Sequence, residues 1–341
     1  REGEVIPQLA ESWSTSEDQT EWTFKLRPNV KFHDGSVMTA ADVVFSAEHV
    51  LADTTSPVRT FMRLVQKVEA LDDLTVKFTL SQPHASFDRQ SKYLYIMSKA
   101  YYEAAGDTGF ATKPVGSGPY RLTEWVKDDR MVLEAFPDYW GGEPAIKKGM
   151  FHPIPSDAAR ANALLSGEID LIPSLPPSLR DMLRGSPELR VETAPGYRVT
   201  FLELDPTRTP FDNAKIREAV DIGIDRVAIA DRLLRGTGKA TGVIVPPSNV
   251  GYDATIPTPQ FDPERAKQLI AESGYDGTPF MIDYPNNNYP MANEVAQAIA
   301  SYLTEAGLKV QLNPMEFTAF FPNWVQNKLS PMYFFAYGSS Q

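Results

Sequence analysis

Apolar side chains occupy every second position in residues 22–26 and again in residues 76–80. This period is typical of a strand that buries one of its faces. Between the two segments, residues 43–51 carry apolar side chains at helical spacing, and Thr39 and Asp42 can form a capping box in front of them. Strand, helix and strand together predict an α/β or α+β lobe in the first part of the chain.

The stretch of residues 197–226 combines a strand with a helix. Residues 199–204 form an apolar run rich in β-forming side chains, and this run ends before Pro206. Asp212 can then cap a helix whose apolar residues, from Ile216 onward, fall on one face. We interpret the stretch as the crossing between two halves of the chain.

A pattern of helix, glycine and strand then occurs twice. Asp262 can cap a helix that Gly274 ends. A second helix ends at Gly307 and precedes the alternating residues 310–312, and residues 332–337 form a further apolar strand. These elements predict an α/β second half.

Composition and charge narrow the classes of protein to consider. The chain has 341 residues, of which 42% are apolar, and its formal net charge is −11. Because single cores stop growing at roughly 250–300 residues, this length favours two lobes. The negative charge argues against nucleic acid or an anionic membrane surface as the main partner. No apolar run approaches the ~20 residues that span a bilayer.

Three patterns that could carry chemistry are better explained as structure. Residues 114–119 contain a GxG but lack the GxxxxGK[ST] form of a phosphate-binding loop, so we interpret them as a structural turn near a cleft. Cysteine is absent and the four histidines lack metal-binding spacing, so we expect no metal site and no cofactor. Glu168 and Asp170, in a short strand expected over residues 168–172, resemble a glycosidase pair but are more often solvated. We therefore expect no catalytic residues.

Seven segments resemble, in the same order, the bacterial extracellular solute-binding proteins of family 5, which are the dipeptide, oligopeptide, glutathione and nickel-binding components of ABC importers. The segments are PQLAESW (7–13), TFKLRPNVKFHDGSVMTAADVVFS (23–46), PVGSGPYRL (114–122), DYWGG (138–142), ALLSGEIDL (163–171), PFDNAKIREAV (210–220) and DPERAKQLIAESGY (262–275). Together they cover nearly the whole chain.

The resemblance implies an α/β fold of the two-lobed periplasmic binding protein-like kind, type II and cluster C. We expect a first lobe over residues 1–194 and a second over residues 195–341, with the hinge crossing near residues 195–201. Closure of rigid lobes about this hinge would bury a solute. The first lobe should be incomplete here, because the family completes it with an N-terminal start and a C-terminal return that lie outside this sequence.

The resemblance also indicates where a ligand would bind. In peptide-binding relatives an Arg-Tyr pair helps to hold the peptide carboxylate, and the corresponding position here is Asn288-Tyr289, within residues 284–290. An asparagine amide cannot make the bidentate contact of a guanidinium. Neutral hydrogen bonding from Asn286, Asn287 and Asn288 to a peptide group or a sugar is possible. A solvated turn before the next helix is the alternative.

Aromatic side chains are the other candidates for the ligand site. We select Tyr197 at the crossing, Tyr289, Trp324 and Tyr337, because such sites have apolar and aromatic walls with few polar groups. For each of them, packing in a core is the alternative.

The expected function is therefore that of a periplasmic solute-binding protein, or an extracellular one with a lipid anchor. It would deliver a peptide or similar small molecule to the permease subunits of an ABC importer. We expect a monomer that binds no nucleic acid and meets the membrane only through the permease or the anchor. The alternatives are a ligand-sensing domain of a regulator, because this fold can be attached to other modules, and a hydrolase.

Overall fold

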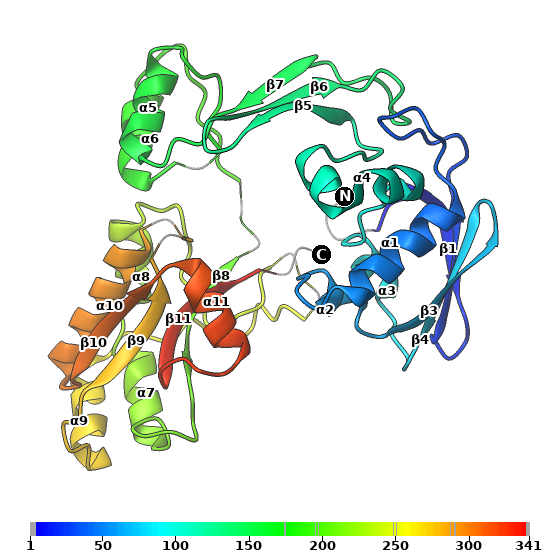
Figure 1. The fold of residues 1–341 in the computed structure, drawn as a ribbon. Coiled ribbons are helices and arrows are strands. Elements are labelled where there is room, and N and C mark those ends of the chain that lie inside the picture. The colour runs from blue at the N-terminus through cyan, green and yellow to red at the C-terminus, as the bar shows by residue number, and fades with distance from the viewer. Residues whose placement is uncertain are drawn as a thin grey trace. The chain divides into compact units, whose positions relative to one another are not determined.

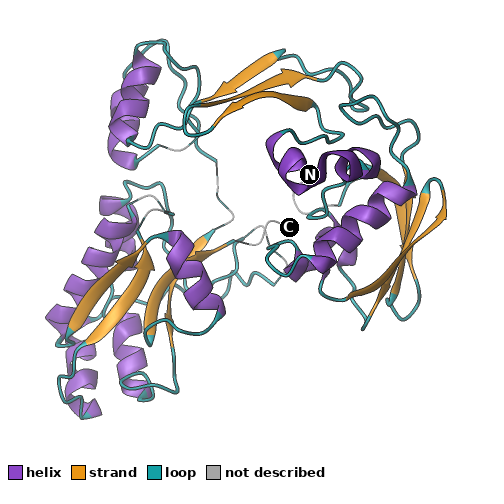
Figure 2. Cartoon of the chain, viewed as in Figure 1, coloured by secondary structure: helices purple, strands orange, loops and turns teal. Residues whose placement is uncertain are grey.

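The computed structural model describes residues 5–338, except for residues 174, 195, 197, 248, 250, 287 and 290 and the side chain of Tyr337. The described residues form two compact units, one ending at Pro153 and one beginning at Ile154 (Figures 1 and 2). The predicted lobe boundary after residue 194 lies later in the chain than this division, and it remains a prediction.

The first unit contains two antiparallel sheets. The strands are β1 (Ala10–Thr15), β2 (Glu21–Leu26), β3 (Val65–Asp72), β4 (Thr75–Leu80), β5 (Tyr120–Val126), β6 (Arg130–Ala135) and β7 (Lys148–Phe151), and the helices are α1 (Ala40–Ala52), α2 (Arg59–Met62), α3 (Phe87–Ser91) and α4 (Lys99–Thr112). One sheet has the order β1-β2-β4-β3 and the other has the order β5-β6-β7.

The first sheet forms as the period-2 pattern predicts. The apolar residues of β2 and β4 are buried, and α1 packs against the same core. The predicted capping box is present, because the Thr39 N–H donates to the Asp42 carboxylate at 2.8 Å. The other oxygen of Asp42 accepts from the Lys99 N–H at 2.9 Å, so one buried carboxylate joins the starts of α1 and α4.

His33 joins the turn before α1 to the loop of residues 114–119. Its backbone N–H donates to the Gly116 carbonyl at 2.8 Å, and the Gly116 N–H donates to its Nδ1 at 3.3 Å. Nε2 lies 3.0 Å from the Gly118 carbonyl oxygen, which can only accept, so the ring proton is on Nε2. The loop therefore has a structural role in this unit.

The second unit is built around one mixed sheet. Its elements are α5 (Asp157–Leu165), α6 (Pro177–Arg184), β8 (Val199–Leu204), α7 (Ala214–Ile222), α8 (Arg226–Ala228), the π-helical turn η1 (Ile229–Leu233), α9 (Pro263–Ser273), β9 (Phe280–Pro285), α10 (Ala292–Ala306), β10 (Val310–Met315), α11 (Phe317–Val325) and β11 (Met332–Tyr337). The strand order is β10-β9-β11-β8, with β9 parallel to both neighbours and β8 antiparallel to β11.

Helices cover both faces of this sheet (Figure 1). Phe334 belongs to the large core formed with α7, α9 and α10, whereas its neighbour Phe335 packs with Phe320 of α11. Because successive strand residues point to opposite faces, the two clusters lie on opposite sides of β11. The predicted α/β character of this half is confirmed.

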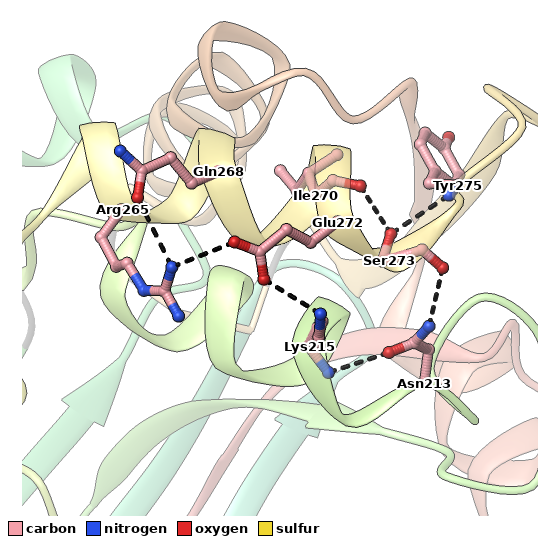
Figure 3. A network of polar contacts seen from close by, with 8 residues as sticks. All are labelled: Asn213, Lys215, Arg265, Gln268, Ile270, Glu272, Ser273 and Tyr275. Carbon is pink, nitrogen blue, oxygen red and sulfur yellow. Dashed lines mark hydrogen bonds and ion pairs between the residues drawn. The ribbon is translucent and has the colours of Figure 1, made fainter.

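Two local expectations were wrong. Helix α7 is capped by Asn213 rather than Asp212, because the Asn213 side chain accepts from the Lys215 N–H at 2.9 Å and donates to the Ser273 carbonyl at 3.0 Å, which fixes α7 against α9 (Figure 3). Residues 168–172 form no strand. The Glu168 N–H donates to the Ala163 carbonyl at 2.9 Å, so the chain wraps around the end of α5 and does not enter a sheet.

His33 generates a testable pH dependence. Burial lowers the pKa of His33 below its ordinary value of 6.5, and the positive charge of Arg121 lowers it further. Because the unfolded chain binds this proton more readily than the folded one, the stability that neutral His33 contributes is present above pH 6.5 and is lost as the pH falls below it.

We expect His33→Gln to lower the free energy of unfolding of the full-length protein by about 1 kcal/mol near neutral pH. The variant should also lose less stability than the wild type when the pH is lowered to about 5.5, because the titrating group is gone. Urea unfolding at both pH values measures this, with the exposed His152→Gln as control. Parallel losses in His33→Gln and wild type would contradict the assignment.

Candidate functional site

The candidate site lies at the carboxyl edge of the sheet in the second unit. We use this name for Asn286, Asn288, Tyr289, Arg198 and the end of β11. The parallel strands β9, β10 and β11 all end at this edge, and ligands of open α/β sheets bind outside the carboxyl ends of the strands. The loop after β9 contains the predicted asparagines, so two of them reach the edge within the described residues.

The sheet parts at this edge. Strand β11 pairs with β9 only at Met332 and Tyr333, although it continues alongside β8 as far as Tyr337. Ala336 lies on the part of β11 beyond Tyr333, where β9 no longer pairs with it, and it is buried. The Tyr289 hydroxyl takes the place of that strand, because it accepts from the Ala336 N–H at 3.1 Å and donates to the Ala336 carbonyl at 3.2 Å.

These two hydrogen bonds define what Tyr289 can do. The hydroxyl donates its single proton to Ala336, and its ring lies edge-on to Phe334 and Phe335, with centroids 6.1 and 6.5 Å away. The side chain is thus fixed between the two cores of the unit. It offers a solute an aromatic wall rather than a free hydrogen-bond donor.

Asn286 has a buried polar atom without a partner. Its backbone N–H donates to the Met315 carbonyl at 2.9 Å, which extends the pairing of β9 and β10 by one residue. Its Oδ1 is buried and accepts no hydrogen bond from the described residues. An unpaired buried acceptor costs about 1–3 kcal/mol, so a solute N–H that reached this atom would bind with that advantage.

The structure describes only some of the other predicted site residues. Asn288 is half-buried in the loop between Asn286 and Tyr289. Tyr197, Asn287 and the side chain of Tyr337 lie outside the described residues, so their roles remain predictions.

Trp324 lies in the aromatic cluster beneath α11. Its ring stacks on Phe335 with the centroids 5.0 Å apart, and its Nε1–H donates to the Tyr333 hydroxyl at 3.2 Å. Burial and a hydrogen bond to the Glu203 carboxylate raise the pKa of Tyr333. Because its polar atom is already paired, any contact of Trp324 with a solute would be through its ring. The predicted ligand role remains a prediction.

Sequence reasoning missed Arg198. This residue precedes β8, and its guanidinium carbon lies 6.0 Å from the centroid of the Tyr289 ring. Its side chain is exposed at the carboxyl edge. The available signal was a basic residue beside an expected hinge strand, but only the pairing of Val199 with Tyr337 shows which end of the sheet it reaches.

A hollow of about 370 Å³ in the first unit is less suited to a polar solute than the carboxyl edge is. Its walls are mainly apolar, and the side chains there that carry polar atoms are those of His49, Asp53, Ser56, Tyr93 and Tyr95. His49 Nε2 lies 3.3 Å from the Tyr102 hydroxyl, which also bonds to Asp107, and that bond raises the pKa of Tyr102 to about 12. The Asp53 carboxylate accepts from the N–H and the hydroxyl of Thr55, so His49 and Asp53 are both already engaged within the first unit.

Other classes of site find little support in the described part of the chain. No group of three or more His, Asp or Glu side chains there could hold a metal ion. Glu168 and Asp170 are both exposed, whereas a glycosidase acid requires an enclosed carboxyl group with a raised pKa. No helix in the described ranges has both the length and the apolar character needed to cross a membrane.

Comparison with known proteins identifies the family. Residues 4–341 match the model of the bacterial extracellular solute-binding proteins, family 5 Middle. The chain belongs to this family. The resemblance inferred from the sequence motifs is confirmed.

Two curated relatives in Escherichia coli K12 are similar to this chain. One is a dipeptide-binding protein, 30% identical over 340 residues, covering 91% of this chain and 63% of the relative. The other is a probable D,D-dipeptide-binding periplasmic protein, 34% identical over 318 residues, covering 92% of this chain and 61% of the relative. The chain thus spans about three fifths of the length of these relatives.

A solved structure confirms the expected fold. An ABC transporter-associated periplasmic binding protein from Helicobacter pylori, in complex with the peptide STSA, superposes with a TM-score of 0.85. The two chains are 27% identical, and the match covers 98% of this chain and 70% of the other. The α/β fold class of periplasmic binding proteins is therefore established for this family member.

Tyr289 can be tested as the residue that closes the parted sheet. Tyr289→Phe removes the hydroxyl and leaves the buried N–H and carbonyl of Ala336 without their partner on that side. We expect the free energy of unfolding to fall by about 2 kcal/mol or more, measured by urea denaturation of the full-length protein.

The matched control for this test is Tyr302→Phe. Tyr302 is half-buried and lies edge-on to Phe261, and its hydroxyl has no hydrogen-bond partner among the described residues. Its substitution should change the free energy of unfolding by less than about 0.5 kcal/mol. Equal effects of the two substitutions would mean that the Ala336 contact is not what stabilises the edge.

Proposed function

We propose that this chain is the solute-binding part of an extracytoplasmic binding protein that captures a peptide, or a similar small polar solute, and delivers it to the permease of an ABC importer. The observation that carries the proposal is the family match over residues 4–341. Two relatives whose names state dipeptide binding, and a structural neighbour solved with a peptide, support a peptide as the solute.

The chemistry of the carboxyl edge supports the same class of solute. The unpaired buried oxygen of Asn286 complements the N–H of a peptide group. The half-buried Asn288 adds a second carboxamide, and Tyr289 adds a fixed aromatic wall. Sites of this kind select by pocket shape and by a few placed hydrogen bonds.

In this proposal two lobes, residues 1–194 and 195–341, close on the solute about a hinge near residues 195–201. The predicted contacts Tyr197, Asn287, Trp324 and Tyr337 belong to the proposed ligand site. The protein acts outside the cytoplasm, in the periplasm or tethered by a lipid anchor, as a monomer without a cofactor or nucleic acid. It releases its solute unchanged and is not an enzyme.

Co-purification tests the proposal directly. Native mass spectrometry of the full-length protein, purified from its own host, should show a bound mass that denaturation releases as an intact peptide. X-ray scattering should then give a smaller radius of gyration with that peptide than after its removal. A protein that carries no solute and binds none of a mixture of random di-, tri- and tetrapeptides by calorimetry does not have the proposed function.

The asparagines can be tested against the same mixture of di-, tri- and tetrapeptides. Asn286→Ala and Asn288→Ala should each weaken binding about tenfold, which corresponds to the loss of one hydrogen bond. Neither should lower the melting temperature by more than about two degrees, because neither side chain has a hydrogen-bond partner among the described residues. The exposed Asn162→Ala on α5 serves as the control. Unchanged affinity in Asn288→Ala would remove that residue from the site.

A further inference from the structure

Arg198 occupies an unusual position at the carboxyl edge. It directly precedes Val199, which pairs with Tyr337 at the end of β11, so its backbone lies beside the point where the parallel strands end. Its side chain extends toward the Tyr289 ring, 6.0 Å from the centroid. That ring is itself held by the two hydrogen bonds to Ala336. The exposed guanidinium therefore lies near a ring whose own position is fixed.

Arg198 has no anionic partner among the described residues. In the same unit six other arginines have a carboxylate oxygen within 4 Å: Arg160, Arg180, Arg190, Arg226, Arg235 and Arg265. Arg208 and Arg217 donate instead to backbone carbonyls. Within the described ranges Arg198 has neither kind of contact and its side chain is exposed, so no described residue occupies the N–H groups of its guanidinium.

An exposed guanidinium beside an aromatic ring is suited to a carboxylate. Its N–H donors match the two oxygens of a carboxylate in a bidentate contact, and contact with an aromatic face leaves those donors unused. The chain carries a net charge of −11, which repels an anionic solute at long range. A local cation at the edge offsets that repulsion where the solute binds.

We propose that Arg198, supported by the Tyr289 ring, binds a carboxylate of the solute at the carboxyl edge. This inference rests on the proposed function and adds to it that the preferred solutes are peptides with a carboxylate that the second unit recognises. The neutral carboxamides of Asn286 and Asn288 then bind the adjoining peptide groups. The carboxylate can be the C-terminal one or an acidic side chain, and the test distinguishes the two.

The test uses calorimetry of the full-length protein with three mixtures of random tripeptides. The first contains neutral side chains and a free C-terminus, the second is the same mixture with amidated C-termini, and the third is amidated but has one Asp or Glu. We expect the wild type to bind the first or the third mixture at least about tenfold more tightly than the second, which is the scale of one charge-assisted contact.

Arg198→Gln should reduce this preference to about twofold and should leave the affinity for the second mixture unchanged. Arg198→Lys should keep part of the preference, because lysine carries the charge but lacks the planar fork of N–H donors. Arg190→Gln is the matched control, because Arg190 is exposed in the same connecting segment but is already paired with Glu192. It should bind all three mixtures as the wild type does.

The outcomes separate the two proposals. If Arg198→Gln keeps the full preference for a carboxylate, or if the wild type binds the neutral amidated peptides as tightly as the others, Arg198 is not the anion-binding group, although the proposed function stands. If the wild type binds none of the three mixtures, the proposed function fails and the inference fails with it. If the wild type prefers the third mixture, but not the first, over the second, Arg198 binds an acidic side chain of the peptide and not its C-terminal carboxylate.

Discussion

The paired hydrogen bonds between the Tyr289 hydroxyl and Ala336 are the constraint on which the carboxyl edge depends. Where neighbouring strands of a sheet part, buried backbone groups lose their strand partners. A tyrosine hydroxyl can accept and donate at once, so it satisfies both groups of Ala336 without supplying another strand. The same contact fixes the ring whose centroid lies 6.0 Å from the Arg198 guanidinium carbon.

Asp283 limits how far this opening extends. It is 2% exposed on β9, and its carboxylate accepts from Asn313 Nδ2 at 2.8 Å and from the Ser330 N–H at 2.6 Å. These contacts join β9 to β10 and to the residues that lead into β11. A buried carboxylate is stable only when its oxygens are hydrogen-bonded, so removal of either partner would be costly. The strands are therefore held together at Asp283 and part only beyond Tyr333.

The sequence predicts most of the fold but only part of the site. Period-2 runs, capping residues and helix-ending glycines have a local cause, so strands such as residues 199–204 and 332–337 were recognised correctly. The cap at Asn213 was misplaced because its choice depends on Ser273, which is distant in sequence. Asn286 and Tyr289 could be selected because their loop resembles the carboxylate-binding position of peptide-binding relatives, whereas the pairing of Tyr289 with Ala336 and the place of Arg198 could not be predicted. Both follow from strand pairings between distant segments.

The two kinds of polar group at the edge would contribute differently to selection of a solute. In the proposed function a buried atom such as Asn286 Oδ1 would discriminate strongly, because a solute without a matching donor would leave it unpaired. An exposed cation such as Arg198 is screened by salt and contributes less binding energy, but it attracts anions before they dock. In the proposed function the carboxamides would therefore decide which backbone geometry fits, whereas the guanidinium would decide how the solute is oriented as it arrives. A site with this division could accept peptides with different side chains and still bind all of them in one direction.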